Sequence, residues 1–333
     1  MARPITLFTI QWGDLSLDEV CKLAQKMGYE GLELSAAHLD MKRAAKDPAY
    51  VAEVKATLAK YGLGCWALSH HLAGQCICDT LPGAYDSRLD GFAPAELAGK
   101  PEEIQKWGIE EMKATAHAAK AMGVGVVTFF MGSPIWKFWY SFPQTSEEQV
   151  EAGYQKVKEL WSPIMDEFDA CGVKLALEVH PTEIAFDYWS TKKLLDTFDW
   201  RPTLGINFDP SHLLWQSVDP VVFCRDFIER VYHVHAKDVK LNFDGRNGVL
   251  GSHITFGDMK RGWNFVSLGH GDVDFDGICR VLNQGGYNGP LSVEWEDSGM
   301  DRVYGATEAA EYLKKYNFNA SDFAFDSAIK AEN

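Results

Sequence analysis

The sequence predicts an α/β protein that folds as a single (β/α)8 TIM barrel with long insertions on one face. Short apolar runs rich in β-branched and aromatic residues alternate about eight times with longer segments of helical period, which is typical of βα units and a parallel sheet. No Gly/Ser-rich linker divides the 333 residues. The chain exceeds the roughly 250 residues of a typical barrel by about eighty. We therefore expect one barrel over residues 1–318, followed by a C-terminal tail at 319–333.

Eight short apolar segments are predicted as strands. Because the parallel strands of a barrel are buried on both faces, they form nearly continuous apolar runs rather than an alternating pattern. In chain order, the predicted strands are residues 5–10, 31–35, 65–69, 124–131, 174–180, 203–209, 231–235 and 291–295.

Helices are predicted between the strands from capping residues and apolar periodicity. Ser16 and Glu19 form a capping box, and Gly28 stands where that helix is expected to end. The apolar positions between them share one helix face and are Val20, Leu23, Ala24 and Met27. Asp47 and Pro48 begin the next helix. The later helices are predicted at residues 101–122, 146–171, 191–198, 275–282 and 307–315, with another beginning at 219–220.

Three long segments account for most of the surplus length: residues 72–100, 132–145 and 239–271. Each follows the C-terminal end of a predicted strand. In (β/α)8 barrels, this is the face on which active sites are built. The additional length is therefore expected where a substrate binds.

The charge of the chain argues against some classes of partner. Lys and Arg number 32 against 47 Asp and Glu, a formal net charge of −15 that repels nucleic-acid phosphates and anionic lipid surfaces. Residues 1–5 lack the apolar region of a signal peptide, and no stretch approaches the ~20 apolar residues of a membrane span. We expect a cytoplasmic protein with neither nucleic acid nor membrane as its partner.

Four predicted strands end in a side chain that can bind a metal ion: Glu178, Asp209, His235 and Glu294. They lie on the last four strands, which are neighbours in a barrel. An unpaired carboxylate at the end of a buried strand is strongly disfavoured, so its charge must be compensated. Pairing with Lys or Arg, or capping the next helix, is one alternative. One divalent ion is the other, and this oxygen-rich set suits Mn²⁺, Mg²⁺ or Co²⁺.

Further polar side chains lie near these candidates in the sequence. His180 is two residues after one candidate ligand and His233 two residues before another, so both point to the ligand side of their strands. His212 is three residues past Asp209, and Lys237 follows the seventh strand. We expect His180, His212 and Lys237 to contact substrate, and His233, deeper in its strand, to be a satisfied core histidine.

Other candidates for substrate contact are predicted on the same rim. His70 and His71 end the third strand, and Arg261 and His270 lie in the late insertion. Glu33, on the second strand, is a further polar residue of the first half of the barrel. Trp12 follows the first strand and Trp136 the fourth. Aromatic faces pack against the C–H surfaces of sugar rings, but Trp residues on a barrel rim equally pack loops, and both interpretations stay open here.

Five short segments of the sequence resemble those of a known protein family. They are Leu177-Glu178-Val179-His180-Pro181, Asp209-Pro210-Ser211-His212, His233-Val234-His235-Ala236-Lys237-Asp238, Gly269-His270-Gly271-Asp272-Val273-Asp274-Phe275 and Gly286-Tyr287-Asn288-Gly289-Pro290-Leu291-Ser292-Val293-Glu294. Together they resemble the xylose isomerase-like TIM-barrel superfamily, which includes sugar phosphate isomerases/epimerases, ketose 3-epimerases and inosose dehydratases. The resemblance covers roughly residues 174–315 and is looser in the first half.

The resemblance assigns roles to particular residues. It implies that the four strand-end side chains bind one divalent ion and that His212 lies near substrate. In the ketose 3-epimerases the two ligand glutamates also move a proton on opposite faces of an enediolate, which would give that role to Glu178 and Glu294. The epimerases carry another glutamate that contacts substrate, and Glu183 matches it only approximately. The aromatic insertion after the fourth strand is a further departure.

The expected function is a divalent-metal-dependent sugar isomerase or epimerase that acts through a metal-bound enediolate on a small sugar or polyol, with Glu178, Glu294 and His180 as catalytic residues. The alternative is a metal-dependent lyase or dehydratase that performs β-elimination on a 3-keto sugar, inosose or keto-glycoside. Its acid or base would be one of four histidines: His70, His71, His180 or His270. A nuclease is disfavoured by the negative charge. A non-catalytic sugar-binding barrel and a homo-oligomer stay open.

Overall fold

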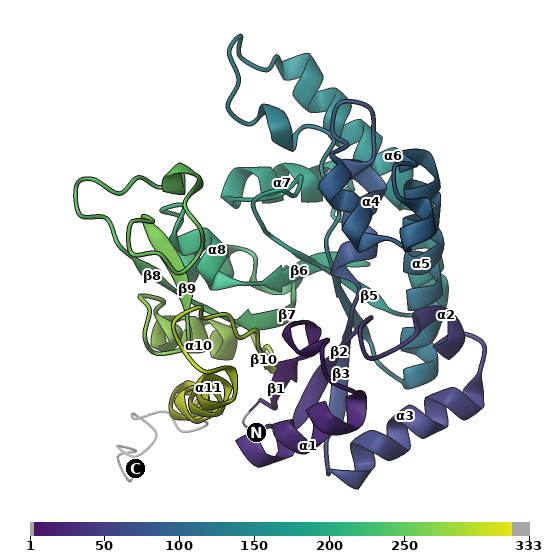
Figure 1. Ribbon diagram of the computed structural model, residues 1–333, viewed down its shortest axis with the longest axis vertical. Coiled ribbons are helices and arrows are strands. Elements are labelled where there is room, and N and C mark those ends of the chain that lie inside the picture. Colours follow the sequence, from purple (N-terminus) through teal and green to yellow (C-terminus); the bar gives the residue numbers. More distant parts are fainter. Residues whose placement is uncertain (1–2, 322–333) are drawn as a thin grey trace, which may run out of the picture.

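The computed structural model describes residues 3–321 and contains a closed barrel of eight parallel strands (Figure 1). The strands pair in the order β1-β10-β7-β6-β5-β4-β3-β2 around the barrel. Their bounds are β1 Ile5–Phe8, β2 Gly31–Ser35, β3 Gly64–Ser69, β4 Val126–Phe129, β5 Lys174–Glu178, β6 Leu204–Phe208, β7 Val231–Ala236 and β10 Leu291–Val293. The predicted fold class is confirmed, and each predicted strand overlaps one barrel strand, with β3 and β7 each extending one residue beyond the predicted range.

Helices cover the outside of the barrel (Figure 1), and α7 and α11 begin three and five residues before their predicted starts. Ser16 and Glu19 form the predicted capping box, and Gly28 ends that helix in the left-handed conformation at φ 83°. The longer helices are α1 Leu17–Met27, α3 Pro48–Lys60, α4 His71–Asp79, α5 Pro101–Met122, α6 Glu147–Cys171, α7 Tyr188–Thr197, α9 Pro220–Asp226, α10 Phe275–Gln284 and α11 Arg302–Tyr316. Two shorter helices are α2 Met41–Ala44 and α8 Pro210–Leu214.

The barrel closes between its first and last strands. β1 pairs with β10 in parallel, with Ile5 opposite Leu291. Just before β1, the backbone of Arg3 is held by Asn317, whose Oδ1 accepts from Arg3 N at 3.2 Å and whose Nδ2 donates to Arg3 O at 2.6 Å. The Arg3 guanidinium donates to Tyr287 O at 2.8 Å. Residues more than 280 positions apart therefore complete the barrel wall.

The first long segment begins with a helix that the sequence analysis did not predict. Residues 71–79 form α4, which packs against α5 beside β4. Gly74 lies inside this helix, and a Cβ there would lie 2.0 Å from Phe130 O. The helix therefore needs a residue without a side chain at its closest approach to the chain after β4, and this residue also weakens the helical pattern. Part of the surplus at 72–100 is thus helical packing rather than rim loop.

The third long segment contains a hairpin outside the barrel. β8 Asp238–Leu241 and β9 Trp263–Val266 pair in antiparallel fashion, and Figure 1 shows them in green beside the barrel. The connection between them is far longer than a tight turn, so no hairpin signal is present in the sequence. Of the tail predicted at 319–333, residues 322–333 lie outside the described residues.

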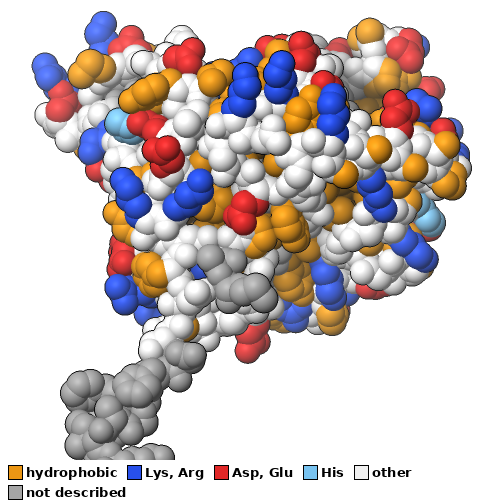
Figure 2. All heavy atoms as spheres, turned by 90° about the horizontal axis from the view of Figure 1, so that it is seen from below, with side chains coloured by type: hydrophobic (Ala, Val, Ile, Leu, Met, Phe, Trp, Pro, Cys, Tyr) orange, Lys and Arg blue, Asp and Glu red, His pale blue; other side chains and the backbone are white. Residues whose placement is uncertain are grey.

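The face of the molecule in Figure 2 carries basic, acidic and apolar side chains interspersed with one another. On that face, no continuous basic surface stands out among the described residues. No helix within residues 3–321 is both long enough and apolar enough to cross a membrane.

Candidate metal centre

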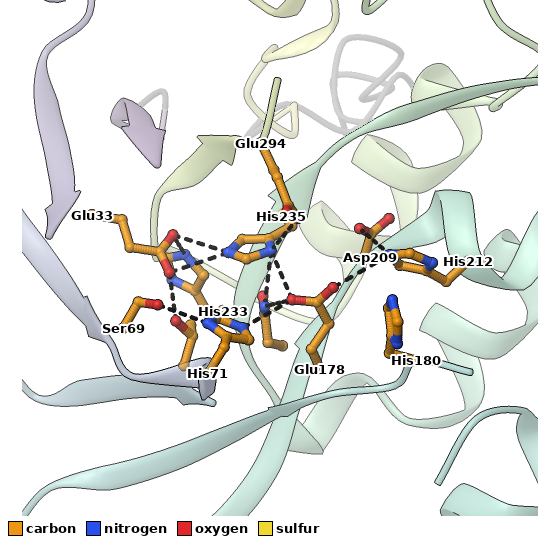
Figure 3. A network of polar contacts seen from close by, with 12 residues as sticks. Glu33, Ser69, His71, Glu178, His180, Asp209, His212, His233, His235 and Glu294 are labelled. Atoms are coloured by element: carbon orange, nitrogen blue, oxygen red, sulfur yellow. Dashed lines mark hydrogen bonds and ion pairs between the residues drawn. The ribbon is translucent and has the colours of Figure 1, made fainter. Parts of the chain in front are cut away.

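Four side chains meet at the C-terminal ends of neighbouring strands. Glu178 is the last residue of β5, Asp209 directly follows β6, His235 lies near the end of β7 and Glu294 directly follows β10. One possible ligand atom from each lies within 4.8 Å of those of the others. All four residues are buried, and the most exposed, Glu294, is 7% accessible. We refer to Glu178, Asp209, His235 and Glu294 as the four-residue centre (Figure 3).

The ring of His235 is oriented by a carboxylate from the opposite side of the barrel. His235 Nε2 lies 3.0 Å from Oε2 of Glu33, on β2. His235 Nδ1 lies 2.9 Å from Glu294 Oε2 and 3.1 Å from Glu178 Oε2. Asn207 Nδ2 lies 3.1 Å from the same Nδ1. Burial lowers the pKa of His235, but Glu33 and Glu294 outweigh it and raise the pKa. A metal ion at the centre would take the place of the Nδ1 proton, while Nε2 donates to Glu33.

Glu33 itself lies in a fully formed polar network. It accepts from His233 Nε2 at 2.8 Å and from Ser292 Oγ at 2.6 Å, besides its contact with His235 (Figure 3). Burial raises the pKa of Glu33, but His235 and His233 outweigh this effect and hold the pKa well below its ordinary value. Glu33 is therefore an ionised carboxylate that orients His235 rather than a group facing the substrate side.

The carboxylate oxygens of the centre are incompletely satisfied. Oδ1 of Asp209 accepts from the backbone and hydroxyl of Ser211 at 2.8 and 2.7 Å, whereas Oδ2 has no hydrogen-bond partner. Oε2 of Glu294 also lacks one, although Nδ1 of His235 is close. A buried carboxylate oxygen without a partner is costly, and a cation coordinated by it removes that cost. The donor set, three carboxylates and one imidazole, fits a divalent ion that prefers oxygen ligands.

One cation of the chain already lies beside the centre. Lys237 Nζ is 3.4 Å from Glu294 Oε1 and 4.0 Å from Asp209 Oδ2. Burial lowers the pKa of Lys237, but the carboxylates of Glu294 and Glu296 outweigh it and raise the pKa. Three carboxylates against one ammonium group leave two negative charges when the histidines are neutral, which is the charge that a divalent ion would balance. Pairing with Lys237, the alternative considered from the sequence, accounts for part of the charge.

Histidines line the remaining sides of the centre. His71 Nε2 lies 3.0 Å from Glu178 Oε2, and Ser69 Oγ fixes its other nitrogen at 2.7 Å. His212 Nε2 lies 3.4 Å from both Glu178 Oε1 and Asp209 Oδ2. His180 packs edge-on against His212, with ring centroids 4.1 Å apart. The structure thus brings His71, His180 and His212 to the centre (Figure 3), together with Lys237.

The titration of these groups follows from burial and neighbouring charges. Burial raises the pKa of Glu178, but hydrogen bonds from His212 and His235 outweigh it and hold the pKa well below its ordinary value. Burial raises the pKa of Asp209 to about 6. Burial, together with the neighbouring His212, lowers the pKa of His180 well below its ordinary value. His180 is therefore neutral at pH 7 and is able to accept a proton.

The other predicted rim residues lie away from the centre. His70 contacts Glu111 on α5 at 3.5 Å, because α4 begins at the next residue and turns only His71 inward. His270 is half exposed and pairs with Glu308 of α11 at 2.7 Å. Trp12 is fully buried beneath the guanidinium of Arg302. Separately, Arg261 stacks on Phe256 and Trp263, and Trp136 lines a cavity next to the centre.

Three residues that contact the centre were not predicted as site residues. Glu33 was noted only as a polar residue of its strand, and Gln11, which donates to Glu294 Oε1 at 3.0 Å, was not noted at all. Asn207 lies two residues before Asp209, so the period of two that pointed to His233 could also have identified it.

Glu183 is fully buried, and its Oε2 accepts from the amides of Met131 and Gly132, both at 2.6 Å.

A closed (β/α)8 barrel with a buried carboxylate and histidine centre at the strand ends defines the class: a barrel protein with a candidate metal site on its catalytic face. The chain belongs to the xylose isomerase-like TIM barrel family, whose model matches residues 21–316. This family includes sugar-processing enzymes, and both epimerases and dehydratases are found among the relatives of this chain.

Individual relatives cover the chain to different extents. The uncharacterized protein YfiH of Bacillus subtilis is 26% identical over 336 residues, 93% of this chain and 98% of its own length. An inosose dehydratase of Clostridium perfringens is 29% identical over 146 residues, 43% of this chain and 48% of its own length. The chain thus spans about half of that dehydratase.

Two solved structures share the fold. The 3-keto-D-glucoside 4-epimerase YcjR of E. coli superposes with a TM-score of 0.66 at 15% identity, covering 94% of this chain and 99% of its own. A xylose isomerase-like TIM barrel protein of Mycobacterium smegmatis, solved in complex with magnesium, has a TM-score of 0.64 at 16% identity, covering 95% and 96%. At these identities the likeness concerns the fold.

Proposed function

We propose that this chain is a divalent-metal-dependent enzyme that isomerises or epimerises a small sugar or polyol. The observation that carries the proposal is the four-residue centre, with two buried carboxylate oxygens lacking hydrogen-bond partners and an imidazole nitrogen turned towards them. Small-sugar chemistry is also consistent with the family. A bound divalent ion would stabilise the negative charge that develops on neighbouring substrate oxygens when a proton leaves carbon.

Glu178, Glu294 and His212 would have different roles in the transfer of the substrate proton. Glu178 and Glu294 are carboxylates suited to removing a proton from the carbon beside a carbonyl and returning one to the substrate. Burial raises the pKa of Glu294, but Lys237 and His235 outweigh it and lower the pKa, so that this carboxylate is ionised and has an oxygen free to accept a proton. His212, beside Glu178 and Asp209, is placed to donate a hydrogen bond to a substrate hydroxyl.

The second candidate function is a lyase or dehydratase that uses the same centre. Two observations favour it. Glu183, the approximate match to the substrate-contacting glutamate of the 3-epimerases, is occupied by backbone amides and does not face the centre. His180 is neutral and lies beside His212, so it can accept a proton as the base in an elimination. The partial match to an inosose dehydratase points the same way.

The two functions are separated by one experiment. The purified protein is incubated with Mn²⁺ and a panel of ketoses, inososes and 3-keto-glycosides, and products are followed by NMR. Interconversion of epimers or isomers supports the first function, whereas loss of water or of an aglycone supports the second. Glu178→Gln should abolish either activity, and Glu308→Gln, a surface control that pairs with His270, should retain it. Absence of turnover by a Mn²⁺-loaded protein on the whole panel would contradict both.

A further inference from the structure

A large cavity lies beside the four-residue centre and shares none of its residues. Its volume is about 1090 Å³, at the upper limit of the roughly 300–1,000 Å³ typical of small-molecule pockets. The walls come from the segment after β4, from the turn between β5 and α7, and from the end of α8 and the β8–β9 insertion. The aromatic residues that line it include Trp136, Trp139, Tyr140, Phe186, Trp215 and Trp263.

Two residues, Gln216 and Phe265, contact both the cavity wall and His212 beside the centre. Gln216, in the cavity wall, donates to His212 O at 2.6 Å and to Phe186 O at 2.8 Å. Phe265 packs against His212 on one side and Trp263 on the other, with ring centroids 5.2 and 5.3 Å apart. Phe265 is therefore the residue that lies between the ring of His212 and the cavity wall at Trp263.

The cavity wall is mainly aromatic and suits a planar apolar group, although Gln144, Asp187 and Ser190 are among its polar residues. Trp215 and Trp263 are stacked at 4.3 Å with an interplanar angle of 7°, and Trp136 and Trp139 are stacked at 6.0 Å. The amide of Gln216 is already engaged by two backbone carbonyls, so it offers no free donor. A sugar carries hydroxyl groups around its ring that need polar partners, whereas flat aromatic faces bind planar rings well.

Large apolar side chains are also exposed where the cavity opens. Tyr140 is 82% accessible, Phe142 102% and Leu250 68%, and all three line the cavity. Such exposed apolar surface on a protein commonly marks a binding site. Its position beside the candidate sugar site favours a group attached to the sugar over a separate protein partner.

We propose that this cavity is an aglycone subsite: the substrate is a glycoside whose sugar lies at the four-residue centre and whose planar, apolar aglycone lies in the cavity, against the outer faces of the stacked tryptophans. The position of the sugar rests on the proposed function, whereas the binding of the aglycone rests on the cavity alone. A free monosaccharide would leave the cavity unused. The subsite also explains why long aromatic insertions follow β4 and β7 in this chain.

Binding of a fluorescent aglycone tests the subsite without turnover. With Mn²⁺ present, 4-methylumbelliferyl β-D-glucoside should bind at least 10-fold more tightly than methyl β-D-glucoside, measured by calorimetry. Trp139→Ala, at a side chain already 53% exposed, should weaken binding of the umbelliferyl glucoside several-fold without unfolding the protein. The matched control is Trp189→Ala, an exposed tryptophan outside the cavity, which should bind as the unmodified protein does. Equal affinity for the two glucosides would overturn the proposal.

The aglycone alone separates this proposal from the proposed function. In EDTA, 4-methylumbelliferone should still bind, and Trp139→Ala should weaken it. If it does so while Mn²⁺ fails to bind the protein, the metal-dependent function is wrong and the apolar subsite stands. If Mn²⁺ binds and umbelliferone does not, the subsite is wrong. A dimer in sedimentation that Phe142→Ser converts to a monomer would show that the exposed wall is an interface between copies, which would also overturn the proposal.

Discussion

The four-residue centre and the aromatic cavity lie side by side but are built in different ways. Every residue of the centre is within or directly after a barrel strand, so its position is fixed by strand register and by burial. The cavity is built largely from connections between barrel elements, and several of its aromatic side chains are exposed. The difference indicates that the barrel provides the chemistry, whereas the insertions provide the choice of substrate.

The largest expected effect is loss of the metal site. The double variant Glu178→Gln and Asp209→Asn removes two of three carboxylates while keeping the side-chain shapes. Bound Mn²⁺, measured by elemental analysis after dialysis, should fall from about one per chain to none, because the remaining ligands are too few. Umbelliferone binding should be retained, since neither residue lines the cavity. The control Glu296→Gln, at a carboxylate outside the centre, should keep its metal, and parallel loss of metal from that control would contradict the assignment.

A smaller effect on metal affinity is expected when Glu33, the carboxylate that orients His235, is replaced. Glu33→Gln removes the anion facing His235 Nε2, so we expect Mn²⁺ affinity to fall about 10- to 100-fold, as is usual for such outer partners of a metal ligand. Titration calorimetry measures this directly. Glu183→Gln is the matched control, because Glu183 is equally buried and contacts the amides of Met131 and Gly132 instead of a candidate ligand. Equal losses in the two variants would show that burial alone, not orientation of the imidazole, determines affinity.

Helix α4 contacts both the four-residue centre, through His71, and the cavity wall, through Asp79 and Ser133. We expect Asp79 to make the stability of the protein depend on pH. Asp79 accepts from the amide of Ser133 at 2.7 Å, next to the amides held by Glu183. Burial raises the pKa of Asp79 to about 6. The folded state then holds this proton more tightly than the unfolded state, so the contribution of Asp79 to stability is fully present below about pH 4 and is lost as the pH rises through about 6.

The loss at Asp79 is at most about 3 kcal/mol, given 1.36 kcal/mol for each pKa unit. Urea unfolding at pH 4.5 and pH 7 measures it. In Asp79→Asn, whose amide oxygen retains the acceptor for Ser133, the contribution of this group should disappear, so the variant should lose less stability than the unmodified chain across this range. An identical pH dependence for both proteins would contradict the raised pKa.

The smallest effect is expected at the mouth of the cavity. Phe142 is fully exposed, so Phe142→Ser should change the free energy of unfolding by no more than about 0.5 kcal/mol. Phe129, fully buried against Trp161, is the contrasting position, where truncation to Ala should cost about 3–5 kcal/mol. Thermal or urea unfolding distinguishes them. A large loss at Phe142 would mean that the insertion is part of the stable core rather than an added binding surface.

The sequence was informative where local chemistry identifies a position. Glu178, Asp209 and Glu294 stand out because a carboxylate at the end of an apolar strand conflicts with its surroundings, and the structure brings them together with His235. Similarly, the capping box at Ser16 and the glycine after it specify the ends of α1 from a few neighbouring residues.

The sequence was less informative where partners are distant. Glu33 and His235 are 202 positions apart in the sequence, and no local sequence pattern predicts their contact. The adjacent histidines His70 and His71 cannot be distinguished from the sequence. The position at which α4 begins determines that His71 faces Glu178, and this helix was not predicted because Gly74 interrupts its helical pattern. The stacking of Trp215 on Trp263 likewise depends on the position of the hairpin, which long-range pairing determines.

The closure of the barrel has a consequence for the order of assembly during synthesis. β10 is the strand that joins β7 to β1, and Glu294 follows it directly. A ribosome-bound chain that has not yet reached residue 294 can contain Glu178, Asp209 and His235 but not the fourth ligand. The same late segment supplies Asn317, which holds the backbone of Arg3. If the four-residue centre binds a metal as proposed, its full affinity would therefore be acquired only at closure, and a truncated or stalled chain would not compete for the ion.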